Sequence, residues 1–221
     1  MKRVIPFLCL LTITISIFSV FFVTDGSAST SNPAEPPFAD IPITHPSIAA
    51  ITWAKENGIF AGKKGNFDPN GTLTRACFTL ILHRLEGSPK PSPSTPTFPD
   101  VDPNGVHFDS IQWAREKGIM GGIRGNARPG YSLPRYQLVT LLYRYHVGEG
   151  RPVKITDGIL DKFPDRVDLP SQNDYDAMAW AVTNGIIGGV RGNLRPNVTV
   201  NREMGATVLY RYNNMYGTIG G

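Results

Sequence analysis

Apolar residues recur along this chain in two alternating patterns, and each pattern occurs three times. A short stretch with apolar positions three residues apart precedes a Gly-Ile pair, and a longer i, i+3, i+4, i+7 stretch follows a glycine-rich segment. Both spacings place apolar side chains on one face of a helix. The pattern therefore predicts six helices, arranged as three helix-loop-helix units.

The first helix of each unit contains a tryptophan. We expect this helix to end at Gly58, Gly118 or Gly185, because glycine readily adopts the left-handed backbone that terminates helices. Its apolar face is expected five and two residues before the tryptophan and one residue after it, at Ile48, Ile51, Ala54; Phe108, Ile111, Ala114; and Tyr175, Met178, Ala181.

The second helix is expected to begin near Thr74, Pro134 or Asn201, because Thr and Asn cap helices well and Pro is tolerated in the first turn. One such hairpin cannot bury its apolar stripe alone, whereas three can bury theirs against one another. We therefore expect an all-α fold of three helix-loop-helix repeats with pseudo-threefold symmetry. The stripe consists of Phe78, Ile81, Leu82, Leu85; Leu138, Leu141, Leu142, Tyr145; and Val208, Leu209, Tyr212, the last set interrupted by Gly205.

Single residues repeat in the same register, which identifies the units as copies of one sequence. The tryptophans are spaced by 60 and 67 residues, each unit opens with Phe-x-Asp, and two arginines follow the tryptophan at fixed offsets of 22 and 31. The repeats are predicted at residues 38–87, 98–147 and 163–216. A Pro/Ser-rich linker, 88–97, and a mixed linker, 148–162, are predicted to join them.

The first 28 residues have a different character. A basic start is followed by an apolar stretch, residues 4–23, and then by the small residues Gly26, Ser27 and Ala28. This pattern predicts a secretory signal peptide cleaved near Ala28, with an uncleaved membrane anchor as the alternative. Cleavage would leave Cys77 as the one cysteine, so the exported chain must be stabilised by core packing rather than by an internal disulfide.

Composition and charge narrow the function. The 221 residues include 22 Lys+Arg and 18 Asp+Glu, and this small net charge of +4, with acidic residues spread throughout, argues against nucleic acid as a partner. The four histidines occupy four different repeat offsets and no catalytic motif is present, so we expect neither an enzyme nor a cofactor. Asp100, Asp102 and Asn104 imitate the start of a calcium loop, but Ile111 stands where its last ligand is needed, so no metal site is expected.

The motifs Phe-x-Asp, Trp-Ala-x-x-x-Gly-Ile, Gly-x-x-Gly-Asn-x-x-Pro and an Arg-headed second helix resemble the S-layer homology repeat. The resemblance covers residues 38–212 and includes the usual triplication. It implies a surface protein, secreted to the cell wall of a Gram-positive-type bacterium and attached without covalent bonds to an acidic, often pyruvylated, secondary cell wall polysaccharide. Other surface-layer proteins are further possible partners, and no membrane contact is expected after signal cleavage.

One departure from the family is clear. The family's second helix opens with Thr-Arg-Ala-Glu, and here the Arg is kept three times while the Glu is replaced by Cys77, Gln137 and Met204. Either that Glu serves capping, which other residues can supply, or the ligand site is altered. The alternative function is therefore a structural one, with repeats packing against other proteins and a degenerate glycan site.

Arg75, Arg135 and Arg202 are the leading candidates for ligand binding. A cation in the first turn of a helix faces the positive end of its dipole, so helix stability does not explain it. With free backbone N–H groups it would form an anion site suited to a carboxylate. In the alternative, each arginine pairs with the aspartate of a Phe-x-Asp motif and joins repeats. Those aspartates, which are also candidate residues of the glycan site, are Asp40, Asp100 and Asp165.

Three further sets complete the predicted glycan site. Trp53, Trp113 and Trp180 fall off the apolar stripe, so they are candidate platforms for sugar rings, or else they pack against the second helix. The loop cations and glycines are a candidate second wall, or else a tight turn with a solvated charge. These are Lys64, Arg124, Arg191, Gly62, Gly122 and Gly189. The later arginines Arg84, Arg144 and Arg211 are expected to be structural, because nine residues place them half a helical circle from the first set.

Overall fold

The computed structural model describes residues 35–217, which belong to one compact unit. The predicted signal peptide lies outside the described residues. Within residues 35–217, no helix is long and apolar enough to cross a membrane. The elements are α1 Ile48–Glu56, α2 Arg75–Leu85, α3 Phe108–Glu116, α4 Arg135–Gly148, the short 3-10 helix η1 Pro164–Asp168, α5 Gln172–Thr183 and α6 Arg202–Tyr216.

The helices begin and end where the sequence predicts. Thr74 and Asn201 cap α2 and α6, because their side-chain oxygens accept the N–H groups of Cys77 (3.2 Å) and Met204 (2.9 Å). Gly58, Gly118 and Gly185 follow the first helix of each repeat with φ of 65°, 69° and 66°. The prediction of an all-α fold is confirmed, and the described residues form isolated β-bridges but no strand.

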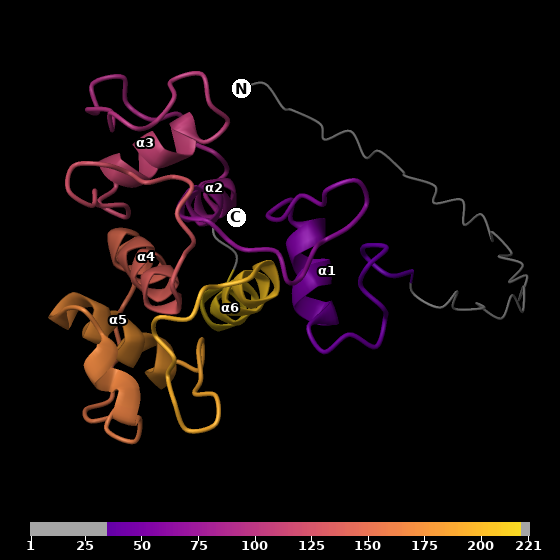
Figure 1. The fold of residues 1–221 in the computed structure, drawn as a ribbon, viewed down its shortest axis with the longest axis vertical. Coiled ribbons are helices and arrows are strands. Elements are labelled where there is room, and N and C mark those ends of the chain that lie inside the picture. Colours follow the sequence, from indigo (N-terminus) through magenta and orange to yellow (C-terminus); the bar gives the residue numbers. More distant parts are fainter. Residues whose placement is uncertain (1–34, 218–221) are drawn as a thin grey trace, which may run out of the picture. The chain divides into compact units, whose positions relative to one another are not determined.

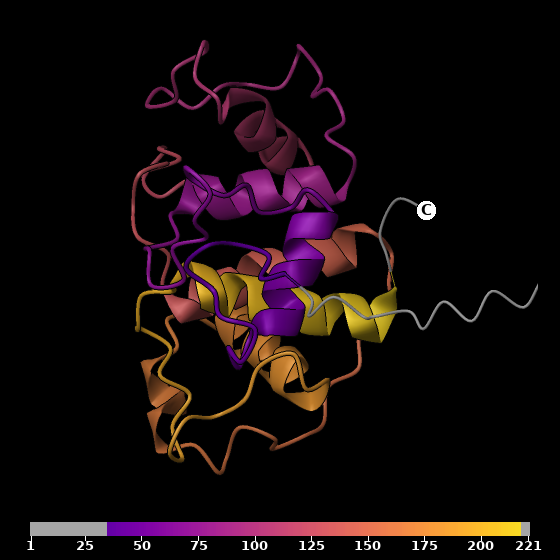
Figure 2. The same cartoon turned by 90° about the vertical axis from the view of Figure 1, so that its right-hand side faces the viewer.

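The helices pair between repeats rather than within them. The closely packed pairs include α2 with α3, α4 with α5, and α6 with α1. Each of these pairs joins the second helix of one repeat to the first helix of the next, and the last pair returns to the start of the described chain (Figures 1 and 2). The three repeats therefore close into a ring.

A triangle of backbone hydrogen bonds lies where the three repeats meet. The N–H of Leu73 donates to the carbonyl of Val200 (2.9 Å), that of Val200 to Leu133 (2.8 Å), and that of Leu133 to Leu73 (2.9 Å). All three side chains are buried. Since each repeat contributes one donor and one acceptor, the triangle has the pseudo-threefold symmetry expected from the sequence.

Candidate ligand grooves between the repeats

The first arginine of each second helix reaches into the following repeat. There it contacts the glycine-rich loop that joins the two helices of that repeat, which we call the glycine loop. Arg75 on α2 donates from Nε to the carbonyl of Ala127 (2.9 Å) and from Nη2 to that of Gly121 (3.1 Å). Arg202 on α6 makes the same two bonds to Phe67 (2.7 Å) and Ala61 (3.0 Å). We call Arg75, Arg135 and Arg202 the exchanged arginines, because each leaves its own repeat and binds the next one.

The backbone at the start of these helices is not free to bind an anion. The N–H groups of Arg75 and Ala76 donate to the carbonyls of Tyr131 (3.0 Å) and Pro129 (3.1 Å), in the following repeat. The first two N–H groups of α4 and α6 are occupied in the same way. The expectation of free helix N–H groups beside each arginine was therefore wrong, because these groups hold the ring together.

The aspartates of the Phe-x-Asp motifs do not pair with the exchanged arginines. Asp40 accepts the N–H groups of Phe67 and Asp68, each at 2.7 Å, and so clasps the loop of its own repeat. Desolvation raises the pKa of this carboxyl, but the two N–H groups outweigh it and hold the pKa below its ordinary value. Asp100 and Asp165 bind the equivalent N–H groups of their own loops. This geometry gives all three aspartates a loop-closing role and contradicts their pairing with the arginines.

The tryptophans pack in the core instead of lining a groove. Trp113 is 2% exposed and Trp180 is 0% exposed, so no ring face remains for a sugar, and the stacking role was wrong for both. Trp113 lies against His83 of α2, and Trp180 lies against Tyr143 of α4. Trp53 is half-buried and its ring is 5.8 Å from that of Tyr210 on α6. The packing alternative holds: Trp113 and Trp180 contact the second helix of the preceding repeat and also that of their own repeat, where Trp113 lies near Tyr145 and Trp180 near Tyr212 and Tyr216.

The glycine loop is a tight turn whose cations face solvent. Lys63 and Asn66 exchange two backbone hydrogen bonds (2.8 and 3.1 Å), leaving Lys64 at the tip with φ of 51°. Arg124 and Arg191 stand at equivalent tips with the same φ, and all three cations are exposed. They are not among the residues that line the cavities between repeats.

The glycine nine residues after each tryptophan also has a structural cause. A Cβ on Gly62, Gly122 or Gly189 would press into the ring of Phe38, Phe98 or Phe163, the first residue of the same repeat's Phe-x-Asp motif. The close approach expected for a ligand is made by this phenylalanine. Gly122 and Gly189 still contribute backbone to cavities, whereas Gly62 does not.

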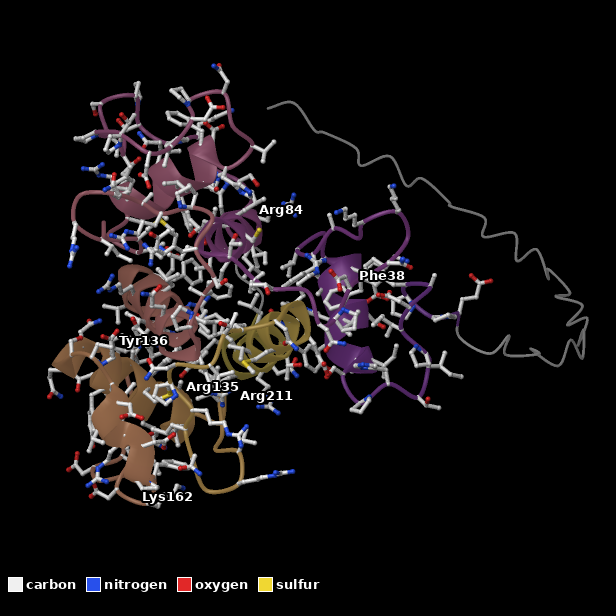
Figure 3. The ribbon with its side chains drawn as sticks, in the orientation of Figure 1. Phe38, Arg84, Arg135, Tyr136, Lys162 and Arg211 are labelled. Atoms are coloured by element: carbon white, nitrogen blue, oxygen red, sulfur yellow. The ribbon has the colours of Figure 1, made fainter. Side chains whose placement is uncertain are left out.

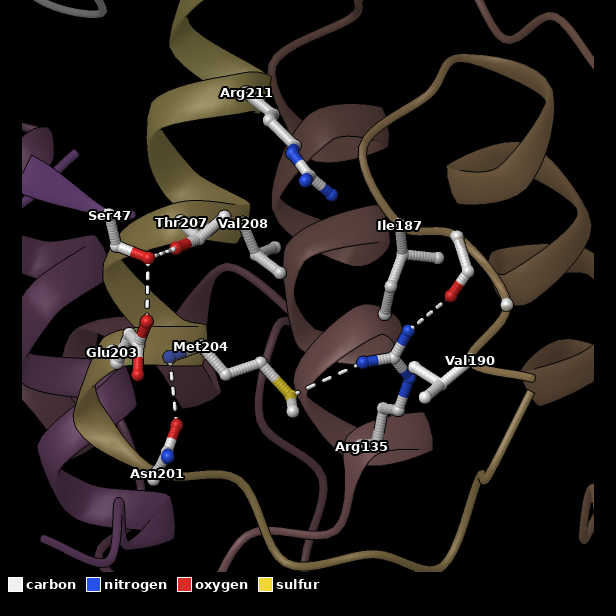
Figure 4. A pocket seen from close by; sticks show the side chains of 12 residues that line it. Ser47, Arg135, Ile187, Val190, Asn201, Glu203, Met204, Thr207, Val208 and Arg211 are labelled. Carbon is white, nitrogen blue, oxygen red and sulfur yellow. Dashed lines mark hydrogen bonds between the residues drawn. The ribbon is translucent and has the colours of Figure 1, made fainter. Parts of the chain in front are cut away.

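Three equivalent grooves lie between repeats, and we name each after the second helix that forms its wall. The α6 groove has a volume of about 410 Å³, the α4 groove about 230 Å³ and the α2 groove about 180 Å³. The wall helix and the glycine loop of each groove belong to one repeat. The exchanged arginine that enters the groove comes from the preceding repeat. Figure 4 shows the α6 groove, with Arg135 entering from α4.

Each groove contains a second arginine that sequence reasoning assigned to structure alone. Arg211, Arg144 and Arg84 line the α6, α4 and α2 grooves beside the exchanged arginine. Arg84 and Arg144 do donate weakly to the carbonyls of Ile59 (3.3 Å) and Ile119 (3.5 Å), whereas Arg211 is exposed. Figure 3 shows Arg135 and Arg211 close together.

The sequence does contain a signal for this arrangement: the two arginines of one second helix point in opposite directions around the helix axis. Because the first arginine leaves for the next repeat and the second stays in its own groove, every groove receives one of each. Desolvation lowers the pKa of all three exchanged arginines, that of Arg135 to about 10, and each still carries its charge at neutral pH. Among residues 35–217, no ion pair neutralises these arginines.

The ring and its grooves define a class of protein: an all-helical module of three tandem repeats, with a pair of arginines in the groove between each two adjacent repeats. Within it, residues 37–76 and 162–203 match the family model described as S-layer homology domain. These two regions carry the S-layer homology domain that the sequence resembles, and such domains imply a cell-surface location and anchoring to the cell wall.

Curated proteins with similar sequences include surface-layer proteins. The chain is 25% identical over 190 residues to the S-layer protein sap of Bacillus anthracis, covering 82% of this chain and 22% of that protein. It is 28% identical over 170 residues to the surface-layer 125 kDa protein of Lysinibacillus sphaericus, covering 73% of this chain and 14% of that one. An endoglucanase of Bacillus sp. (strain KSM-635) is 29% identical over 148 residues, 65% of this chain and 15% of the enzyme. The chain thus spans under a quarter of these relatives, and the enzyme's activity does not extend to it on this ground.

Proposed function

We propose that this chain anchors itself to the cell wall of a Gram-positive-type bacterium by binding an acidic, pyruvylated secondary cell wall polysaccharide in its grooves. The observation that carries the proposal is the pair of arginines in each groove, of which the exchanged member forms no ion pair with an acid of residues 35–217. Two guanidinium groups across a cleft suit a carboxylate, because charge-assisted hydrogen bonds are the stronger kind. The exchanged arginines and Arg84, Arg144 and Arg211 are the proposed binding residues.

A repetitive polymer fits a ring with several grooves. Once one groove holds the polymer, the next acidic unit binds at a high effective concentration, so no single groove need bind tightly. The proposal also takes the middle segment, residues 98–147, as a repeat of the same family, which is supported by the equivalent contacts of Arg75, Arg135 and Arg202. The repeat boundaries, the signal peptide and the absence of catalysis remain predictions.

The test is retention of residues 34–221 by purified cell wall polysaccharide, with and without its pyruvyl groups. The exchanged arginines are poor targets for substitution, because they also join the repeats. Arg211→Gln is the better variant, since Arg211 is exposed and lines the α6 groove. We expect binding to weaken about tenfold, which corresponds to ~1.4 kcal/mol.

Arg191→Gln is the matched control, because it removes an equal charge from an exposed turn tip outside the grooves and should leave retention unchanged. Equal retention of the polymer without pyruvyl groups would contradict the role of the acidic group. No retention of either polymer would contradict anchoring and favour the structural function.

A further inference from the structure

The exchanged arginine occurs three times in equivalent positions, but its surroundings differ. In each groove its inner edge faces the carbonyls of the glycine loop, and its outer side faces the third residue of the next second helix. We call Cys77, Gln137 and Met204 the facing residues. They occupy the position where the family motif has glutamate, so each groove lacks the acid that would neutralise its arginine.

In the α4 groove each nitrogen of the guanidinium has one acceptor within the protein. Arg75 donates to two loop carbonyls, and its Nη1 donates to Oε1 of Gln137 at 2.9 Å. The groove is also lined by Asp174, whose carboxylate accepts from Thr140 (2.7 Å) and repels an anion. This groove therefore has little to offer an acidic ligand.

In the α2 groove the arginine is compensated by aromatic rings. Arg202 donates to two loop carbonyls, and its guanidinium lies 5.3 Å from the ring centroid of Phe60 and 5.0 Å from that of Phe67. A cation over aromatic faces is stabilised by their quadrupoles. Cys77 faces it as a small neutral side chain, and this groove has the smallest volume of the three.

In the α6 groove the arginine is left short of acceptors. Arg135 is 6% exposed, its Nη2 donates to the carbonyl of Gly188 (2.6 Å), and its Nη1 donates to the sulfur of Met204 (3.3 Å), a weak acceptor. Its Nε is buried and has no partner in the described part of the chain, unlike Nε of Arg75 and Arg202. A buried donor without an acceptor is costly, so this guanidinium gains most from an anion.

The rest of the α6 groove is compatible with such a ligand. It is the largest of the three, and Arg211 extends into it from α6 (Figure 4). The one acid lining it, Glu203, accepts from the hydroxyl of Ser47 (2.6 Å) on the α1 side, across Met204 from Arg135.

We propose that the surroundings of the exchanged arginine select the groove, and that the α6 groove alone binds an acidic sugar, whose carboxylate displaces the Met204 thioether from Arg135 and pairs with Arg211. This inference rests on the proposed function and narrows it from three equivalent grooves to one. Met204 is then the specificity-determining residue of this chain.

The experiment is an NMR titration of residues 34–221 with methyl β-D-glucuronide, and with methyl β-D-glucoside as the uncharged probe. The amides of Gly188 and Met204 report on the α6 groove, those of Gly121 and Gln137 on the α4 groove, and those of Ala61 and Cys77 on the α2 groove. We expect the glucuronide to shift the α6 reporters alone and the glucoside to shift none.

Two substitutions exchange the facing residues. Met204→Gln copies the α4 groove and should weaken glucuronide binding at least fivefold, because the new amide oxygen occupies Nη1 of Arg135. Gln137→Met combined with Asp174→Asn copies the α6 groove, because Asp174 would otherwise repel the anion, and this double variant should produce new glucuronide shifts at Gly121. Met204→Leu is the matched control: it keeps the volume, supplies no acceptor, and should keep the shifts.

Several outcomes would each overturn the inference. In the titration they are equal shifts in all grooves, shifts in another groove, an equal response to the glucoside, or no response to the glucuronide. Among the variants it is unchanged binding in Met204→Gln. The Gln137→Met, Asp174→Asn double variant without new shifts would also overturn it. Retention of the cell wall polysaccharide is measured separately. Polymer retained without α6 shifts rejects the inference alone, whereas α6 shifts without polymer retention reject anchoring alone.

Discussion

A glycine nine residues after each tryptophan lies directly against a phenylalanine ring. The same phenylalanine stands two residues before the aspartate that accepts hydrogen bonds from the glycine loop. The Phe-x-Asp motif and the glycine loop therefore form one packed unit. The positions of these residues could be predicted from their repetition, but their purpose could not. A motif can be repeated because it binds a ligand or because it forms a turn. The sequence alone does not distinguish the two cases, and only the contacts of each side chain do.

Gly189→Ala tests this role at the residue scale. The added Cβ would press into the ring of Phe163, and overpacking of this kind costs about 1–3 kcal/mol. The neighbouring Gly188→Ala is the control, since no atom lies within 4 Å of its added Cβ and its φ is not positive. Chemical denaturation should show a lower free energy of unfolding for the first variant alone. Equal stability of the two variants would contradict the packing argument.

At the scale of the element, the helix limits were predictable and the helix partners were not. Capping residues and glycines mark the ends within a few residues of sequence, so local chemistry sufficed. Helix pairing depends on contacts between residues far apart in the chain. An apolar stripe does not show whether the helix packs against the other helix of its own repeat or against a helix of the next repeat. This is why the sequence offered Trp113 and Trp180 as sugar platforms although they are buried, and why it did not place the second arginines beside the exchanged ones.

Histidine side chains fasten the segments that follow α2 and α4. Nε2 of His83 binds the carbonyl of Pro89 (2.8 Å), and Nε2 of His146 binds that of Pro152 (3.0 Å). His146 is fully buried, and its Nδ1 lies 3.3 Å from the hydroxyl of Tyr212 on α6. Desolvation holds the pKa of His146 below its ordinary value of 6.5, so the folded protein keeps it neutral.

The free energy of unfolding should therefore fall as the pH is lowered through 6.5. There the unfolded chain gains a proton at His146 that the folded protein takes up only at lower pH, so the stability present above pH 6.5 is lost on acidification. His146→Gln removes this titration. It should be less stable than the wild type at pH 7, and the difference should shrink by pH 5. Denaturation curves at several pH values measure it, and parallel pH profiles would contradict it.

At the scale of the whole molecule, the closed ring distinguishes this module from an open stack of repeats. In a solenoid each repeat contacts only its neighbours in sequence, so a terminal repeat can be lost with a local effect. Here α6 packs against α1, and Arg202 binds the loop of the first repeat. Every repeat therefore has two neighbours, and there is no terminal one.

Removal of the third repeat should consequently unfold the other two. In residues 34–162, α1 would lose α6, α4 would lose α5, and the N–H of Leu73 would lose its acceptor, Val200. Residues 34–221 should unfold in one cooperative transition followed by circular dichroism, whereas residues 34–162 should show none. The control is a protease site placed between the exposed residues Pro93 and Ser94, because cutting this linker breaks the chain but leaves all three helix pairs. The cut protein should keep its fold, and a cooperative transition in residues 34–162 would instead mean that the repeats fold independently of ring closure.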